Sequence, residues 1–232
     1  MAAGLTSAIF VAGAHTDVGK THAACALIGA ARARGLSCDA FKPVLSGFSP
    51  EAAAASDAGR LLAALGRPLD EIDAVSPLRF AAPVAPPMAA RREGVRLRMA
   101  DILGRCRGWL DASPAQLRLL EGAGGLMSPL AEDGLALDLP AALGLPSILV
   151  GGGYLGAVSQ TLTALEVMRT RGLAVLAVVA SEDASPDAPP FGETLEMLRA
   201  FAEVPIVAAE RRDARWADDL LDVVLAHDGK AG

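Results

Sequence analysis

The sequence is poor in cysteine, in aromatic residues and in clustered basic residues, and these shortages exclude several classes of protein. Its three cysteines have no Cys-x-x-Cys spacing, which argues against a disulfide framework or a zinc site and fits a reducing cytoplasm. The net charge is −6, and no run of Lys or Arg marks a nucleic-acid surface. No apolar run approaches the roughly 20 residues that cross a membrane, and no basic segment typical of a signal peptide precedes the first apolar stretch. We therefore expect a cytoplasmic protein with no nucleic-acid or membrane partner.

The apolar part of the chain is built mainly of small side chains. Hydrophobic residues make up 52% of the 232 residues, but aromatic residues only 4%, and much of the remainder is alanine. This composition predicts a globular core in which helices pack closely on a sheet. We see no domain boundary and no internal repeat, so we expect residues 1–232 to form one domain.

Short apolar runs of strand length alternate with longer segments of helical periodicity. We expect strands at residues 7–12, 38–44, 116–120, 147–150, 173–180 and 204–208. We expect helices at 21–34, 56–65, 97–110, 155–171, 191–202 and 214–227. We expect residues 67–94 to be Pro-rich and irregular, and the segments 83–87 and 183–190 to be surface loops. The alternation predicts an α/β fold of three layers, with a mostly parallel sheet and helices on both faces.

The segment Gly13-Ala-His-Thr-Asp-Val-Gly-Lys-Thr21 lies between the first expected strand and the first expected helix. It is a variant of the phosphate-binding pattern G-x-x-x-x-G-K-[ST], because the first glycine comes one residue early. Gly19 and the helix N-terminus would present backbone N–H groups to phosphate oxygens. Lys20 would follow the β- and γ-phosphates, and the Thr21 hydroxyl suits Mg²⁺. An ordinary strand-to-helix turn is the alternative, but the surrounding strand and helix favour a nucleotide loop of the P-loop NTPase class.

Three further polar residues stand where strands end or helices begin. Lys42 follows the second strand, so it should share the ligand edge of a parallel sheet with the phosphate loop, although a solvated lysine would also fit there. Asp57 opens a helix, where a carboxylate interacting with the helix dipole is the alternative to a Mg²⁺ ligand. Glu121 ends a strand before a glycine-rich segment, the usual place for a metal-binding acid in phosphate-loop enzymes.

Several motifs together resemble the ATP-dependent dethiobiotin synthetase family. They run in the family's order from about residue 9 to residue 180, and the segments at 41–47 and 80–86 are more specific than the Gly-Lys-Thr loop. The matching segments are Phe10-Val-Ala-Gly-Ala-His-Thr-Asp-Val-Gly-Lys-Thr21, Phe41-Lys-Pro-Val-Leu-Ser-Gly47, Ser56-Asp57, Phe80-Ala-Ala-Pro-Val-Ala-Pro86, Glu93-Gly94 and Glu121-Gly-Ala-Gly-Gly125, with a weaker match at 155–163.

The resemblance implies a ligase that joins 7,8-diaminononanoate with CO₂, using ATP and Mg²⁺, to close a cyclic urea through a carbamate and a carbamic–phosphoric anhydride. It implies that Lys42 is catalytic, that Thr16 and Ser46 contact the diamine or carbamate, and that Thr21, Asp57 and Glu121 ligate Mg²⁺. It also implies a homodimer. The nucleotide-binding residues would be Asp17, Val18, Gly19, Lys20, Thr21, Asp57, Glu121, Gly122, Ala123 and Gly124.

The sequence departs from the family pattern mainly where the base would lie. The family's adenine-binding Asn is Ser181 here, and residues 207–211 replace a Leu-Gly-x-x-Pro element. Ser159-Gln160 replaces Asn-His, and His15 stands where Asp is frequent. These departures predict looser selection among nucleoside triphosphates.

Two other classes share this loop. Cobyrinate-amidating synthetases carry a glutaminase domain with a nucleophilic cysteine, and Cys106 lacks the strand–turn context for that role. A nucleotide-switch ATPase of the partitioning type, acting as a binding protein, would carry an extra lysine in the loop, and residues 15–21 contain none. The ligase therefore remains the leading hypothesis.

Overall fold

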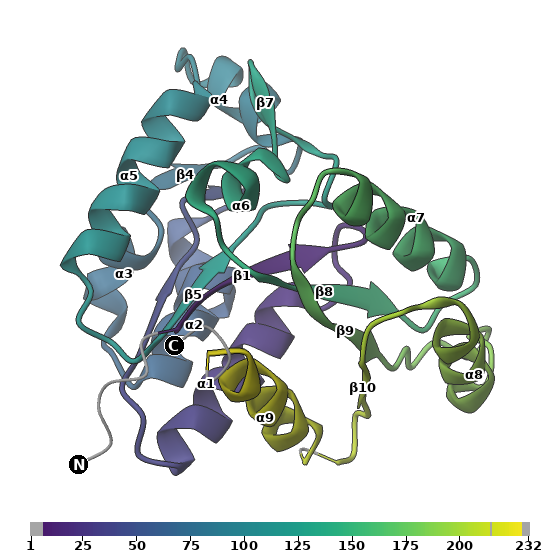
Figure 1. Cartoon of the computed structure of the whole chain (residues 1–232). Helices are drawn as coiled ribbons and strands as arrows, with labels where there is room; N and C mark the ends of the chain where they lie inside the picture. Colours follow the sequence, from purple (N-terminus) through teal and green to yellow (C-terminus); the bar gives the residue numbers. More distant parts are fainter. Residues whose placement is uncertain (1–6, 214, 229–232) are drawn as a thin grey trace.

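The computed structural model describes residues 7–213 and 215–228, and its centre is a six-stranded sheet (Figure 1). All neighbouring strands of this sheet pair in parallel. In spatial order the strands are β10 (Ile206–Ala209), β9 (Val175–Ser181), β8 (Ser147–Gly152), β1 (Ser7–Gly13), β5 (Leu117–Glu121) and β2 (Cys38–Phe41). The predicted parallel α/β sheet is confirmed.

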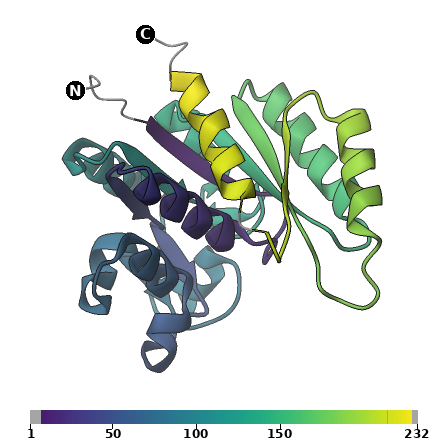
Figure 2. The same cartoon turned by 90° about the horizontal axis from the view of Figure 1, so that it is seen from below.

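Alternate residues of the strands face opposite sides, and helices cover both (Figure 1). In β1, Ile9 and Val11 belong to one core cluster, and Phe10 and Ala12 belong to another. Three helices pack on the first face, α1 (Lys20–Ala33), α2 (Asp57–Leu65) and α9 (Trp216–Asp228). The second face is covered mainly by α5 (Met99–Ala112), α6 (Asp138–Leu143), α7 (Ala157–Thr170) and α8 (Phe191–Phe201). Figure 2 shows α9 beside α1, with α7 and α8 together at another side of the molecule.

The single strand expected at residues 38–44 is wrong, because the chain leaves the central sheet after Phe41. The backbone N–H of Lys42 donates to Val75 O at 2.8 Å, outside the sheet, and Pro43 has no N–H to continue a ladder. A separate two-stranded sheet follows, in which β3 (Val44–Ser46) pairs in parallel with β4 (Leu78–Phe80). Lys42 therefore lies directly after the end of β2, which is an edge strand of the central sheet.

The irregular structure expected at residues 67–94 and the surface loop expected at 83–87 are also wrong. Pro86 and Pro87 are buried at the start of α4 (Pro86–Arg92), where the missing proline N–H breaks no helical hydrogen bond. Ala89 and Ala90 of this helix reach the core. The region also contains η2 (Leu69–Glu71), α3 (Ile72–Val75) and β4, and η1 (Pro50–Ala55) precedes α2. Two short strands that the patterns did not predict, β6 (Pro129–Ala131) and β7 (Gly134–Leu135), form a hairpin before α6.

Several predicted boundaries move by a few residues. The helix expected from residue 155 begins at Ala157, and Leu155 before it is 84% exposed. The last helix begins at Trp216, and Ala214, its expected start, lies outside the described residues. The segment 183–190 contains no helix or strand, as predicted. Across the described ranges, no helix is both long and apolar enough to cross a membrane.

Candidate nucleotide and phosphoryl-transfer site

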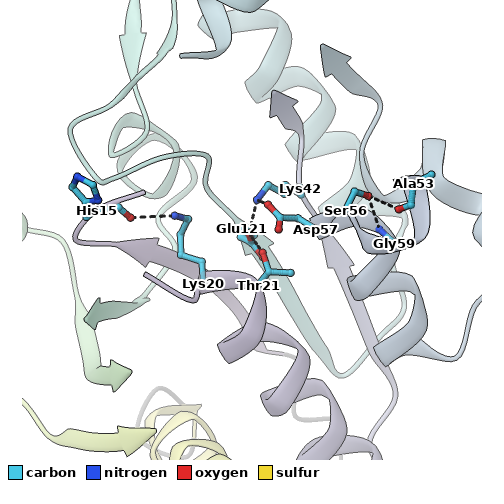
Figure 3. Close-up of polar contacts among 9 residues, drawn as sticks. All are labelled: His15, Lys20, Thr21, Lys42, Ala53, Ser56, Asp57, Gly59 and Glu121. Atoms are coloured by element: carbon cyan, nitrogen blue, oxygen red, sulfur yellow. Dashed lines mark hydrogen bonds and ion pairs between the residues drawn. The ribbon is translucent and has the colours of Figure 1, made fainter. Parts of the chain in front are cut away.

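The loop between β1 and α1 folds so that Lys20 turns back over it (Figure 3). Asp17 and Gly19 both have positive φ, 59° and 95°, and Gly19 adopts this left-handed conformation without the strain of a Cβ. The Lys20 Nζ lies 3.4 Å from the His15 carbonyl oxygen, and its side chain is almost fully buried. The loop therefore presents a lysine and helix-start N–H groups to one point, as phosphate binding requires.

Lys20 sits in an unfavourable environment for a charge. Burial, and secondly the nearby ammonium of Lys42, lowers the pKa of Lys20 from 10.5 to about 8. The carboxylates of Glu121 and Asp57 only partly offset these effects. An anion bound beside Lys20 would restore its charged form, so the loop is poised to bind phosphate.

A cluster of four side chains lies next to the loop (Figure 3). The Lys42 Nζ donates to Asp57 Oδ2 and, at 2.6 Å, to Glu121 Oε1. The Thr21 Oγ1 donates to the same Glu121 oxygen at 2.7 Å. Four elements supply the cluster: the end of β2, the start of α2, the end of β5 and the first turn of α1.

The charges of the cluster support one another. Burial lowers the pKa of Lys42, but Glu121 and Asp57 outweigh this effect and hold it above its usual value. Burial raises the pKa of Asp57, but Lys42 reverses the effect and holds it below its usual value. Lys42 is 3% exposed and Glu121 1%, so the solvated lysine that the sequence alone allowed is wrong. Asp57 opens α2 after the Ser56 N-cap, as its helix-start position predicted, and it also pairs with Lys42. Its role as a Mg²⁺ ligand stays a prediction.

The oxygen atoms of this cluster suit Mg²⁺. Glu121 Oε2 is buried and has no hydrogen-bond partner among the described residues, so this oxygen is free to bind a cation. Carboxylate and hydroxyl oxygens are the hard donors that Mg²⁺ prefers, usually one or two carboxylates together with phosphate oxygens and water. Within the described ranges, no group of three or more His, Cys, Asp or Glu side chains forms a separate metal site. The residues present fit a Mg²⁺ held jointly with a phosphate ligand.

Most of the residues predicted for the site surround one cavity of about 300 Å³, which we call the terminal-phosphate cavity. Val18 and Gly122 are exceptions: Val18 lines a neighbouring cavity, and Gly122 packs behind the site against Phe10. The sequence analysis missed three lining residues, His22, Leu45 and Arg60. The predicted residues that line the cavity are Thr16, Asp17, Gly19, Lys20, Thr21, Lys42, Ser46, Asp57, Glu121, Ala123 and Gly124.

A second cavity, of about 380 Å³, adjoins the first on the other side of the loop, and we call it the base cavity. Its lining includes Ser181 and Arg211, so the departures noted at 181 and 207–211 do lie together. Gly153 forms part of the wall, and a Cβ there would lie 3.0 Å from both Ser181 O and Asp183 N. The two cavities share Asp17, Gly19 and His22. A nucleotide would therefore extend from one cavity to the other across the start of α1.

A third cavity, of about 500 Å³, lies on the remaining side of the loop. His15 and Thr16 line it together with Ser159 and Gln160 of α7. Met127, which also lines it, is 48% exposed. This cavity is open and partly apolar, and Thr16 connects it with the terminal-phosphate cavity.

Solved structures share this fold. A plasmid partition protein from Borrelia burgdorferi aligns with a TM-score of 0.55 and 11% identity, covering 98% of this chain and 99% of that one. Cobyrinic acid a,c-diamide synthase from Mycobacterium smegmatis, with bound ATP analog and magnesium, aligns with a TM-score of 0.53 and 14% identity, covering 98% and 97%. Identities this low show the fold alone. Together with the loop geometry, they define a P-loop NTPase fold.

Closer relatives narrow this class. A family profile described as an AAA domain matches residues 7–210. The ATP-dependent dethiobiotin synthetase of Phenylobacterium zucineum (strain HLK1) is 58% identical over 224 residues, which cover 95% of this chain and 96% of that protein. The enzyme of the same name from Caulobacter vibrioides (strain NA1000 / CB15N) is 53% identical over 219 residues, covering 94% and 99%. The chain belongs to the ATP-dependent dethiobiotin synthetase family.

Proposed function

We propose that the chain closes the cyclic urea of dethiobiotin from 7,8-diaminononanoate, CO₂ and ATP, as an ATP-dependent ligase of biotin biosynthesis. The observation that carries this proposal is the cluster of half-exposed Asp57 with the buried Lys42, Glu121 and Thr21, which lies in one cavity with the phosphate loop and Ser46. A nucleotide-switch ATPase would need the phosphate loop, but it would not need Lys42 beside the proposed substrate residue Ser46. The family relatives also favour the ligase.

The reaction requires three changes of bonding. One amine of the substrate and CO₂ form a carbamate, with loss of a proton. A carbamate oxygen then bonds to the γ-phosphorus as the bond from that phosphorus to the β-phosphate oxygen breaks, which gives the carbamic–phosphoric anhydride and ADP. The second amine finally attacks the carbamate carbon, loses its proton and expels inorganic phosphate, so that the ring closes.

The residues of the cavity suit these changes. We assign the holding of Mg²⁺ to Thr21, Asp57 and Glu121, and the ion would neutralise charge on the β- and γ-phosphates. Lys20 would hold the transferring phosphate from the loop side. Lys42 would stabilise the carbamate and the anionic oxygens of the moving phosphoryl group, since a fixed ammonium in a buried site stabilises developing negative charge strongly.

The same side chains suggest how Lys42 becomes available. In the structure its ammonium bridges Asp57 and Glu121, the carboxylates that we assign to Mg²⁺. If a divalent cation shared the charge of those carboxylates, Lys42 would be held less firmly by them and would reach the carbamate beside Ser46, which lines the same cavity. Thr16, on the opposite side of the cavity, would donate a hydrogen bond to the diamine or carbamate.

Three further properties complete the proposal. We propose that residues 1–232 form one catalytic domain, because α9, near the end of the described chain, packs on α1, the helix that follows the phosphate loop. We propose a homodimer through the face that carries Met127 and the third cavity, since an exposed apolar side chain beside an open, partly apolar cavity favours a partner subunit there. We propose a cytoplasmic location, which suits the three free cysteines. Light scattering on the purified protein tests the dimer, and a monomer at micromolar concentration would contradict it.

The decisive experiment is an assay of the purified protein with diaminononanoate, bicarbonate, Mg²⁺ and ATP. We expect one dethiobiotin, one ADP and one phosphate per turnover, measured by mass spectrometry and phosphate release. Omission of the diamine or the bicarbonate should stop phosphate release. Release that continues at the same rate without the diamine would instead support the nucleotide-switch ATPase.

A further inference from the structure

We propose that Arg60 is a third cation of the terminal-phosphate cavity and binds the phosphoryl group while it moves from ATP to the carbamate. This inference rests on the proposed function, because it assigns a residue to the same transfer step. Arg60 belongs to no sequence motif, but the fold brings it to the lining of this cavity.

Arg60 lies on the same face of α2 as Asp57. Residues three positions apart in a helix are neighbours, so the guanidinium extends from the turn that follows the carboxylate. Both side chains line the terminal-phosphate cavity, together with Lys42. The charge of Arg60 also acts on Cys25, one turn after Thr21 on α1: burial raises the pKa of Cys25 to about 12, and Arg60 opposes that rise. Arg60 thus lines the cavity from α2, which packs beside α1.

The two cavities show which part of a nucleotide Arg60 can reach. The base cavity and the terminal-phosphate cavity share Asp17, Gly19 and His22, which mark the middle of the nucleotide path. Arg60 lines the cavity that also contains Lys42 and the proposed substrate residues, and it is not among the residues that line the base cavity. It therefore stands at the γ-phosphate end and away from the base and ribose.

The guanidinium is free to make this contact. In the part of the chain that the structure describes, Arg60 forms no ion pair or hydrogen bond, while Arg67, further along, is held by Asp39 and Glu71. The helix that carries Arg60 is nevertheless well fixed. Ser56 caps α2 by accepting from Gly59 N at 3.2 Å, and Gly59 packs so closely on the Ala53 carbonyl that a side chain would not fit (Figure 3).

A third cation is needed on electrostatic grounds. Lys42 is already paired with both Asp57 and Glu121, and Lys20 is the other ammonium that lines the cavity. The triphosphate and the carbamate together bring more negative charge than these lysines and one Mg²⁺ balance. During transfer the charge spreads over the equatorial oxygens of the phosphoryl group. A planar guanidinium can donate two parallel hydrogen bonds to such oxygens, which an ammonium cannot do.

Kinetics of Arg60→Ala and Arg60→Lys test the role. We expect kcat to fall about 10- to 100-fold in Arg60→Ala, with the KM for the diamine changed less than about twofold. Arg60→Lys should recover part of the loss, because it keeps the charge without the planar fork. Arg105→Ala is the matched control: Arg105 is also an exposed helical arginine without a partner among the described residues, but it lies on α5. Its kcat should match the wild type. A normal kcat in Arg60→Ala would overturn the inference.

A binding measurement separates this inference from the proposed function. With Mg²⁺ present, Arg60→Ala should weaken the non-hydrolysable analogue AMPPNP about tenfold and leave the affinity for ADP within about twofold. Equal weakening of both ligands would overturn the inference, because it would place Arg60 at the inner phosphates. So would unchanged affinity for both. If the wild type makes no dethiobiotin, the proposed function fails, while the difference between AMPPNP and ADP still decides the role of Arg60.

Discussion

The two adjoining cavities at the phosphate loop differ in the kind of residues that line them. The terminal-phosphate cavity holds charged groups from four elements, and Lys42 and Glu121 there are almost fully buried and paired. The base cavity is lined mostly by loop residues, with Gly153 and Ser181 in its wall. A buried charge cannot be replaced without exposing its partner to a large desolvation cost. A small loop side chain can be replaced at little cost in stability. We therefore expect substitutions to impair phosphate binding and transfer more than they impair recognition of the base.

The largest effect should follow from Lys42→Ala. We expect kcat to fall about 10²- to 10³-fold, because the variant loses the fixed positive charge next to the carbamate and phosphoryl oxygens. The same change leaves Glu121 buried without its ammonium partner, so the free energy of unfolding should fall by about 3 kcal/mol in the absence of Mg²⁺. Steady-state kinetics and urea unfolding measure the two effects.

Folding and chemistry can be separated in that variant. Mg²⁺ with AMPPNP should recover much of the lost stability, because the cation replaces Lys42 beside Asp57 and Glu121. Binding of AMPPNP to the folded variant should persist. A variant that binds AMPPNP and turns over at nearly the wild-type rate would remove Lys42 from the mechanism and break the contrast between the two cavities.

A change in the wall of the base cavity should cost less. In Gly153→Ala the new Cβ would lie 3.0 Å from backbone atoms of Ser181 and Asp183, so the β9 end must shift. We expect the affinity for ATP to fall about tenfold while inhibition by inorganic tripolyphosphate stays unchanged, because only the base loses contacts. Gly108→Ala is the control, since a Cβ at Gly108 meets no atom within 4 Å. Parallel loss of tripolyphosphate binding would mean that the two cavities are not independent.

The composition of the base cavity also predicts loose triphosphate selection. Ser181 offers one hydroxyl where the resembled family pattern has an amide that can both donate and accept. We expect kcat/KM for ATP, CTP and GTP to agree within about tenfold, and Ser181→Asn to raise the preference for ATP about fivefold. Competition assays with pairs of triphosphates measure the ratios. A strict preference of the wild type for ATP would show that other groups, such as backbone atoms, read the base.

The two cavities also differ in how far the sequence could predict them. The phosphate loop, Lys42, Asp57 and Glu121 stand at strand ends and helix starts, and hydrophobic periodicity locates those positions well. The resemblance to a family supplied the proposed roles. The burial and mutual pairing of Lys42, Asp57 and Glu121 required the structure, because side chains 79 positions apart along the chain meet only after folding.

The missed elements share a physical cause. At Lys42-Pro43 the apolar run continues through a proline, and the pattern does not show that the backbone leaves one sheet for another. At Pro86-Pro87 the composition indicates a loop, while the structure uses both prolines to begin a buried helix. Arg60 carried no motif, and only the position of α2 beside α1 brings it to the cavity. Such tertiary placements follow from packing that local patterns do not encode.

The smallest predicted effect concerns pH and tests the burial of Lys20. In the free protein the pKa of Lys20 is lowered to about 8, and bound phosphate would raise it by favouring the ammonium. Binding above pH 8 must therefore take up a proton, and affinity falls as pH rises through the free-state pKa. We expect the Kd for Mg·ADP to increase about fourfold from pH 7 to pH 8.5. Lys20→Arg is the control, because its guanidinium stays charged throughout and should give a flat profile. Calorimetry in buffers of different ionisation enthalpy measures the proton directly. No proton uptake by the wild type at pH 8.5 would mean that Lys20 keeps its charge in the free protein, and the terminal-phosphate cavity would then be more hydrated than its burial indicates.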